Sequence, residues 1–290
     1  MTASVNVNGR TSPARDAVVP VLDHGFLFGD GVYETLRTYG RRPFLFDRHL
    51  DRLKMSAAMI NMPIPLSDTE WLDRVEETLR AAGGSDEAYI RLVLTRGVGE
   101  VTYDPAATPT PTVVIIVKPL IVPPPDWYQR GVPIILATVI RNHPHAIDPR
   151  IKSNNLLNNA LAMQEALRHG ATEALLKNYR GELAECAQSN FFIVRAGEAL
   201  TPGLEAGLLE GVTRNVLLEV GPNAGVAVRE AVLREEDLQS ADEAFITSTT
   251  REVLPVVRVG PYVIGSGHPG AVTHRLHEAF IDQVRAAARR

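Results

Sequence analysis

The chain has 290 residues, of which 45% are hydrophobic and 22% are charged, and its formal net charge at pH 7 is −4. This composition is ordinary for a folded globular protein of one large or two smaller domains, and it argues against intrinsic disorder. The charge balance also argues against the basic surface that nucleic-acid-binding proteins need, so we expect no nucleic-acid partner.

Residues 1–121 predict a small α/β domain. The stretch 31–39 has the pattern of a strand, and after a Gly/Pro turn residues 44–46 continue it as a hairpin. After Asp47 the apolar residues keep helical spacing, which predicts an amphipathic helix. Three further elements are expected: a helix opened by the capping box of Ser67 and Glu70 and ended at Gly83, and strands over 88–97 and 112–120.

The three prolines within 122–131 predict an interdomain linker, because consecutive prolines are unfavourable in a helix or a central strand. Residues 132–290 then form a larger C-terminal domain. We expect it to contain strands over 132–140, 172–178 and 189–197, two strands within 241–257, and helices after Lys152, over 211–220 and over 270–290. The fold class is α+β, with two lobes and a cleft between them.

Metal binding and disulfides are not expected. The single cysteine, Cys186, excludes an internal disulfide and reads as a small buried apolar residue. The histidine pairs His143/His145 and His274/His277 lack the nearby acids that a metal site needs. No stretch approaches the ~18 apolar residues of a membrane span, and the first ten residues lack the apolar core of a signal peptide, so we expect a cytoplasmic enzyme.

Lysine is scarce in this chain, and one lysine has an unusual position. Arginine supplies 26 of the 30 basic residues, and Lys152 directly precedes a serine and two asparagines at the start of a predicted helix. Arginine stays protonated, whereas a desolvated lysine can lose its proton and act as an amine nucleophile. Lys152 is therefore a candidate catalytic residue.

Two short segments could bind an anion such as phosphate. The helix that starts near Gly211 would present the amide of Val212 and the hydroxyl of Thr213, and the segment 247–250 ("TSTT") supplies several hydroxyl donors after a buried strand. The alternative for the first segment is an ordinary helix start with Thr213 as N-cap.

Glu185 lies in a nearly uncharged stretch that leads into an apolar strand, so its carboxylate could be buried and would then need a cationic partner. The alternative is a solvated glutamate on an edge strand. A lysine, two anion-binding segments and a buried acid are together what pyridoxal 5′-phosphate (PLP) requires of a protein.

Six stretches carry a resemblance to a known family: "DHGFLFGDGVYETLR", "FDRHLDRL", "IKSNNLLNNALAMQEA", "GELAECAQSNFFIV", "LLEGVTR" and "DEAFITSTTREVLPV". In this order they resemble the class IV (fold type IV) PLP-dependent aminotransferases, which include branched-chain and D-amino-acid aminotransferases and aminodeoxychorismate lyase. The resemblance extends from about residue 21 to 257.

The resemblance implies roles for individual residues. Lys152 would bind PLP as a Schiff base and then move the proton between the substrate Cα and the cofactor C4′, and Glu185 would hold the pyridine nitrogen. Leu209 would pack on the ring, and the phosphate would be held by Arg52, Gly211, Val212, Thr213, Ser248 and Thr249. The family is built as homodimers in which loops of the neighbouring subunit close the site, so at least a dimer is expected.

The resemblance also implies the substrate-binding residues, which we expect to be Tyr33, Arg37, Tyr89, Arg91, Thr250 and Arg251, with Glu34 beside them. The pattern "AYIR" at 88–91 and the place of Arg37 match branched-chain enzymes. The arginine and histidine with which D-amino-acid enzymes trap a carboxylate are replaced by Val101 and Tyr103.

Two features argue against a branched-chain enzyme. Leu156 and Leu157 follow the lysine as they do in D-amino-acid enzymes, and Arg251 is unusual for the branched-chain group and could offer a carboxylate a different partner. The balance favours transamination of branched-chain L-amino acids with 2-oxoglutarate. D-amino-acid transamination, with (R)-amines as a side reaction, is the second interpretation, and aminodeoxychorismate lyase activity is the third.

Overall fold

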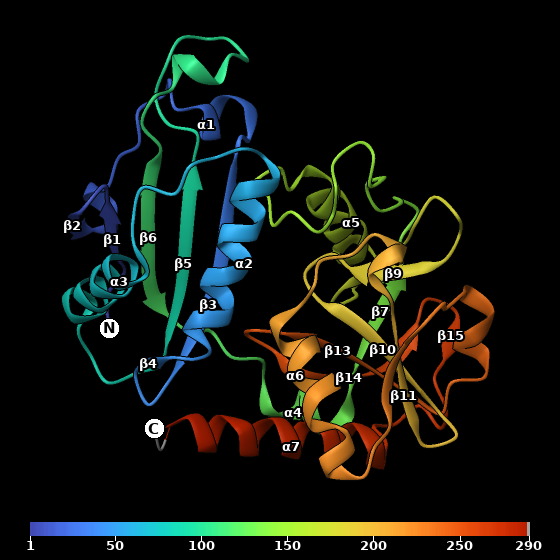
Figure 1. The fold of residues 1–290 in the computed structure, drawn as a ribbon. Coiled ribbons are helices and arrows are strands. Elements are labelled where there is room, and N and C mark those ends of the chain that lie inside the picture. Colours follow the sequence, from blue (N-terminus) through green and yellow to red (C-terminus); the bar gives the residue numbers. More distant parts are fainter. Residues whose placement is uncertain (289–290) are drawn as a thin grey trace. The chain divides into compact units, whose positions relative to one another are not determined.

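The structure is a computed structural model that describes residues 1–288, so residues 289 and 290 of the expected last helix lie outside the described part. It contains two compact units. Unit 1 comprises Met1–Ile121 and Ile151–Asn155, and unit 2 comprises Val122–Arg150 and Leu156–Arg290. The chain contains both helices and strands, and the strands form two sheets, which confirms the expected α+β class (Figure 1).

The core of unit 1 lies between an antiparallel six-stranded sheet and two helices. The strand order is β2-β1-β6-β5-β3-β4. Side chains alternate between the two faces of a strand, and Val32, Leu36 and Leu92 point to the face that helices α2 and α3 cover. The elements are β1 (Ser4–Val7), β2 (Arg10–Pro13), α1 (His24–Phe28), β3 (Gly31–Tyr39), β4 (Arg42–Pro43), α2 (Phe46–Met59), α3 (Asp68–Ala82), β5 (Ala88–Thr95) and β6 (Thr112–Pro119).

Local signals predicted the start of α3 correctly and the start of α2 incorrectly. The Ser67 hydroxyl accepts from the Glu70 amide and the Glu70 carboxylate accepts from the Ser67 amide, which is the expected capping box. Residues 44–46, in contrast, do not continue a strand, because α2 already begins at Phe46. The earlier start lets the Phe46 side chain pack against the core of unit 1.

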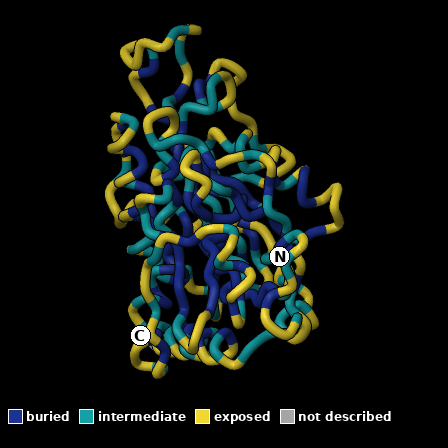
Figure 2. The backbone as a smooth tube through the Cα atoms, turned by 90° about the vertical axis from the view of Figure 1, so that its right-hand side faces the viewer, coloured by how far each residue is buried: buried dark blue, intermediate teal, exposed yellow. Residues whose placement is uncertain are grey.

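Unit 2 is built on a nine-stranded mixed sheet in the order β12-β11-β10-β13-β14-β7-β8-β9, with β15 paired to β14. Helices α6 and α7 pack on each other and on β13 and β14. The central strands β10 and β13 are mostly buried, and Figure 2 shows the buried backbone in dark blue and the exposed backbone in yellow. The elements are α4 (Pro125–Arg130), β7 (Val132–Leu136), α5 (Leu157–Arg168), β8 (Ala174–Lys177), β9 (Leu183–Cys186), β10 (Asn190–Arg195), β11 (Glu198–Pro202), α6 (Val212–Val220), β12 (Val228–Ala231), β13 (Glu243–Ser248), β14 (Glu252–Val259), β15 (Tyr262–Val263) and α7 (Ala271–Ala288).

The proline-rich segment differs from the expected linker. It contains α4, which packs on β14 and belongs to unit 2. Pro125 occupies the first helical turn, where the missing amide hydrogen would have no helical partner in any case. The argument that these prolines exclude a helix was therefore wrong. Within residues 1–288 none of the helices combines the length and apolar character needed to cross a membrane.

Candidate functional site

Lys152 is held at an edge of the unit 1 sheet. The amide of Tyr33 in β3 donates to the Lys152 carbonyl (2.9 Å), and the amide of Asn154 donates to the Gly31 carbonyl (2.8 Å). The Lys152 amide in turn donates to the Ser56 hydroxyl of α2 at 3.1 Å. These bonds place residues 151–155 in unit 1, whereas the sequence had assigned them to the C-terminal domain.

The lysine amine lies beside aromatic and cationic side chains of the same unit. Its Nζ is 4.6 Å from the centre of the Tyr33 ring, and the Arg91 guanidinium lies 3.8 Å from the same centre. Strand pairing sets Tyr33 and Arg37 of β3 on the same face as Tyr89 and Arg91 of β5, opposite the face covered by α2 and α3. The four substrate-binding residues predicted for this part of the chain thus share one face of the sheet, with Tyr33 next to the amine.

The other face of β3 holds a buried ionic cluster of Glu34, His49 and Arg52. The Glu34 carboxylate is fully buried and accepts from Arg52 Nε (2.7 Å), Arg52 Nη2 (2.9 Å) and His49 Nδ1 (2.8 Å). Burial alone would raise the pKa of Glu34, but Arg52 and His49 lower it far below its usual range. Glu34 therefore orients Arg52. The Glu34 side chain points to the face of β3 opposite Tyr33, whereas the sequence led us to expect both side chains to line the pocket.

The ionic cluster makes unit 1 sensitive to acid. Burial lowers the pKa of His49 below its ordinary value of 6.5 despite the neighbouring Glu34 carboxylate, and the nearby Arg52 and Lys152 charges lower it further. Below about pH 6.5 the unfolded chain therefore binds a proton that the native chain does not bind, and stability falls. Glu34, with its lowered pKa, adds a second loss below its ordinary value of 4.5.

We expect the free energy of unfolding to fall with a slope of up to roughly 1.4 kcal/mol per pH unit below pH 6.5, and His49→Gln to flatten this slope. The measurement is urea unfolding at pH 7.5 and 5.5. In a Trp127→Phe background the tryptophan fluorescence comes from Trp71 alone, which is buried in unit 1 and therefore reports on its unfolding. Glutamine retains a side-chain amide that can donate to Glu34 but does not titrate. Equal slopes in both proteins would contradict this role of His49.

In unit 2, Glu185 lies on β9 and is buried, which excludes the alternative of a solvated glutamate. Arg141 donates from Nε to the Glu185 carboxylate at 2.7 Å and from Nη1 to Asn158 Oδ1 at 3.2 Å. A buried carboxylate needs such a counterion. The sequence left burial and exposure of Glu185 both open, and it did not indicate Arg141, which lies 44 residues away.

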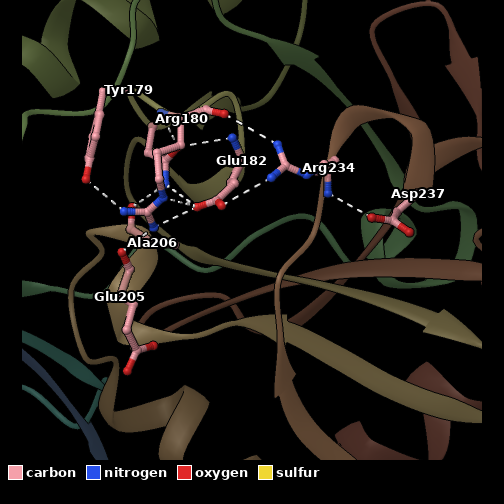
Figure 3. Close-up of polar contacts among 8 residues, drawn as sticks. Tyr179, Arg180, Glu182, Glu205, Ala206, Arg234 and Asp237 are labelled. Atoms are coloured by element: carbon pink, nitrogen blue, oxygen red, sulfur yellow. Dashed lines mark hydrogen bonds and ion pairs between the residues drawn. The ribbon is translucent and has the colours of Figure 1, made fainter.

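The connection between β8 and β9 is tied down by an ionic network (Figure 3). Arg180 donates from Nε to the Glu182 carboxylate (2.7 Å) and from Nη2 to the Glu205 carbonyl (2.6 Å). Arg234 reaches the other oxygen of Glu182 at 3.4 Å and donates its amide to Asp237 at 2.8 Å. The Arg180 hydrogen bond lowers the pKa of Glu182. Glu182 directly precedes β9, so this network supports the start of the strand that carries Glu185.

The two predicted anion-binding segments meet at Asn190 of β10. Its side-chain amide donates to the Leu209 carbonyl at 2.9 Å, and across the sheet it pairs with Thr247 of β13. Gly211 is the N-cap of α6, so the alternative with Thr213 as N-cap is wrong. Within residues 1–288 the buried hydroxyl of Thr247 has no hydrogen-bond partner. Asn190 thus connects the segment that begins at Leu209 with Thr247, the first residue of the second segment.

Gly211 cannot carry a side chain without moving Asn190. A Cβ atom built on Gly211 would lie 1.9 Å from Asn190 Oδ1, although the backbone φ of −73° suits any residue. We expect Gly211→Ala to lower the free energy of unfolding by about 1–3 kcal/mol through this overpacking, and to weaken PLP binding. Urea unfolding and PLP titration of the apoprotein measure both effects.

A double variant provides the control for this steric effect. Asn190→Ala should reduce the cost of adding Gly211→Ala, because it removes the oxygen that the new methyl group would meet. Fully additive losses would show that the contact with Asn190 is not the cause.

Arg251 lies beside buried residues of unit 2. Its Nη1 contacts the fully buried Glu173 carboxylate and the Ser189 hydroxyl (3.2 Å), and its Nη2 donates to Gln188 Oε1 at 3.4 Å. The guanidinium predicted to bind a substrate carboxylate thus already has a carboxylate partner within the protein. Glu173 and Ser189 carried no sequence signal that singled them out.

Comparison with known proteins gives consistent results. The family model described as amino-transferase class IV matches residues 31–259. A Methanocaldococcus jannaschii protein provisionally named as a branched-chain-amino-acid aminotransferase is 39% identical over 278 residues, covering 96% of this chain and 95% of that protein. A D-alanine aminotransferase of Listeria monocytogenes is 35% identical over 283 residues, covering 97% and 96%.

Solved structures agree with these matches. The branched-chain amino acid aminotransferase of Escherichia coli has a TM-score of 0.92 at 30% identity, covering 97% of this chain and 94% of that one. A second solved branched-chain amino acid aminotransferase, with a TM-score of 0.92 at 28% identity, contains pyridoxamine 5′-phosphate and covers 99% of this chain and 95% of its own.

Proposed function

Because this chain belongs to the class IV aminotransferases, we propose that it is a PLP-dependent transaminase that moves amino groups between branched-chain L-amino acids and 2-oxoglutarate. The family resemblance and the transaminase class predicted from the sequence motifs are confirmed. The observation that carries the proposal is the position of the Lys152 amine, next to the Tyr33 ring on a segment held by three hydrogen bonds.

The described residues fit PLP. When bound, PLP supplies an electron sink that stabilises negative charge on the substrate Cα. Lys152 would hold the cofactor and then take and return the Cα proton, and Glu185 would hold the pyridine nitrogen. The unpartnered Thr247 hydroxyl and the helix N-terminus at Gly211 support an anion site there. Its proposed ligands are Arg52, Gly211, Val212, Thr213, Ser248 and Thr249, with Leu209 against the ring.

The unit 1 face beside Lys152 supports a substrate with an apolar side chain and a carboxylate. The rings of Tyr33 and Tyr89 supply apolar surface, and Arg37 and Arg91 supply positive charge. Arg91 stacks on Tyr33, so its guanidinium is held at the level of the ring. Thr250 in unit 2 is half-buried and keeps its proposed place among the substrate contacts.

D-amino-acid transamination is the second candidate. The 35% identity to a D-alanine aminotransferase supports it, as do Leu156 and Leu157 after the lysine. The pairing of Arg251 with Glu173 removes one argument for it, because that arginine was the extra cation suited to a differently placed carboxylate.

A half-reaction screen tests the substrate. The PLP-loaded enzyme is mixed separately with L-leucine, D-alanine, L-glutamate and (R)-phenylethylamine, and the decay of the cofactor absorbance band is followed without an amino acceptor. We expect L-leucine and L-glutamate to react fastest. A faster reaction with D-alanine would contradict the branched-chain proposal, and pyruvate released from aminodeoxychorismate without an acceptor would point to the lyase.

We further propose that the protein works in the cytoplasm as a homodimer. The free, buried Cys186 is compatible with a reducing compartment. Val18, Val21, Phe26 and Tyr103 of unit 1 are each at least 70% exposed, and exposed apolar surface of this kind often marks an interface. Light scattering should give twice the chain mass for the wild type, and Phe26→Asp/Tyr103→Asp should shift it toward the monomer. An unchanged dimer would place the interface elsewhere.

A further inference from the structure

The turn between β13 and β14 carries the hydroxyls that are proposed to bind phosphate, and its last residue is Arg251. Ser248 and Glu252 pair across the ends of the two strands, so residues 249–251 form a three-residue turn. Such a turn presents its hydroxyls in a defined direction only if other groups hold it. The contacts of Arg251 supply that support.

The side chain of Arg251 connects the turn to the interior of unit 2. Glu173, directly before β8, is fully buried, and its carboxylate contacts Arg251 Nη1 and the Ser189 hydroxyl (3.3 Å). The Arg251 side chain itself is 16% exposed. A buried carboxylate is stable only with a close cation and hydrogen bonds, so this pair strongly favours one position of Arg251.

The backbone of Arg251 is held as well. Its carbonyl accepts from the Tyr128 hydroxyl of α4 at 3.1 Å, and its amide donates to the Ser248 hydroxyl at 3.3 Å. A hydroxyl that accepts this bond keeps its own hydrogen for donation to an anion. Arg251 thus orients a proposed phosphate ligand directly.

The next residue is in a conformation that must be enforced. Glu252 has a φ of +55°, in the left-handed region that side chains other than glycine rarely adopt. Its carboxylate accepts from His277 Nε2 of α7 at 2.9 Å, and the Tyr128 ring stacks on His277. Contacts of Arg251 and of Glu252 with other elements of unit 2 therefore hold the end of the turn in place.

We propose that Arg251 is a positioning residue whose ion pair with Glu173 locks the Ser248–Thr250 turn in the conformation that binds the cofactor phosphate. The proposal rests on the proposed function, because it takes the turn to be a phosphate site. It assigns Arg251 a role different from binding the substrate carboxylate. A positioning role predicts that loss of Arg251 weakens PLP binding, whereas a substrate-binding role predicts that it raises the KM for the amino acid.

The test uses Arg251→Met/Glu173→Gln, which removes both charges and so leaves no buried unpaired carboxylate. Apoprotein is titrated with PLP and, separately, with inorganic phosphate. Both dissociation constants should rise about tenfold or more, which is the scale on which outer-shell partners act at metal sites. At saturating PLP, the KM for L-leucine should stay within about twofold. Arg251→Lys should recover part of the PLP affinity.

A matched control is the exposed ion pair of Arg229 and Glu198 between β11 and β12 (2.6 Å). Arg229→Met/Glu198→Gln should leave both dissociation constants unchanged. A higher KM for L-leucine with unchanged PLP affinity in the Arg251 variant would overturn the proposal in favour of substrate binding. Lack of PLP binding by the wild type would instead contradict the proposed function itself.

Discussion

Replacing Lys152 with alanine is expected to lower kcat by about 10⁴-fold, the upper range for a positioned proton-transfer group. The variant lacks both the amine that would carry the cofactor and the base that would take the Cα proton. Borohydride reduction followed by peptide mass spectrometry measures the first loss, and steady-state kinetics with L-leucine measure the second. In the wild type, reduction should attach the cofactor irreversibly to the peptide that contains Lys152.

Lys177→Ala is the control for this experiment. Lys177 is also half-buried, but its Nζ pairs with Glu235 at 2.9 Å in unit 2. Its loss should affect stability slightly and leave the reducible bond in place. A Lys152→Ala protein that still forms a reducible bond to PLP would show that another lysine carries the cofactor.

Replacing Glu185 with alanine is expected to affect activity and stability together. Loss of the carboxylate that would face the pyridine nitrogen should lower kcat by about 10²–10³-fold. It also leaves the buried Arg141 without its counterion, which should cost about 3–5 kcal/mol of unfolding free energy. Urea unfolding and kinetics at saturating PLP would be measured on the same preparations.

A second variant separates the two effects. Glu185→Ala/Arg141→Met removes both charges, so most of the lost stability should return while kcat stays low. Wild-type activity in this double variant would rule out a catalytic role for Glu185 and leave it as the partner of Arg141 alone.

The family and the fold class were accessible from the sequence because their signals are local. The capping box of α3 depends on Ser67 and Glu70, three residues apart, and the helix after Lys152 depends on a spacing of three and four residues. The nearly uncharged surroundings of Glu185 raised burial as one of two alternatives, and the structure shows that it is buried. Such signals fail where tertiary packing decides, as at Phe46, which joined a helix instead of a strand because it packs on the core.

The sequence suggested which residues belong to the candidate site, but it did not indicate which charged residues pair with one another inside the protein. Arg52 is a proposed phosphate ligand, but the sequence did not indicate that its guanidinium also binds Glu34, on the face of β3 that lies away from Tyr33. Arg251 was expected to bind the substrate, and its guanidinium forms an ion pair with the carboxylate of Glu173, 78 residues earlier in the chain. A charge in a sequence shows that a partner is needed, but its identity depends on which strands become neighbours.

By itself, the sequence of this protein determined the longer helices, about half of the strands, the family and the residue types that the chemistry needs. Those properties follow from side-chain spacing, capping and motifs within about 15 residues. Only the tertiary structure decided that Lys152 belongs to unit 1, since its segment satisfies the free edge of β3 through backbone hydrogen bonds. The partners of Glu185 and Arg251 were likewise decided there, because burial makes a counterion obligatory and sheet register determines which one is within reach.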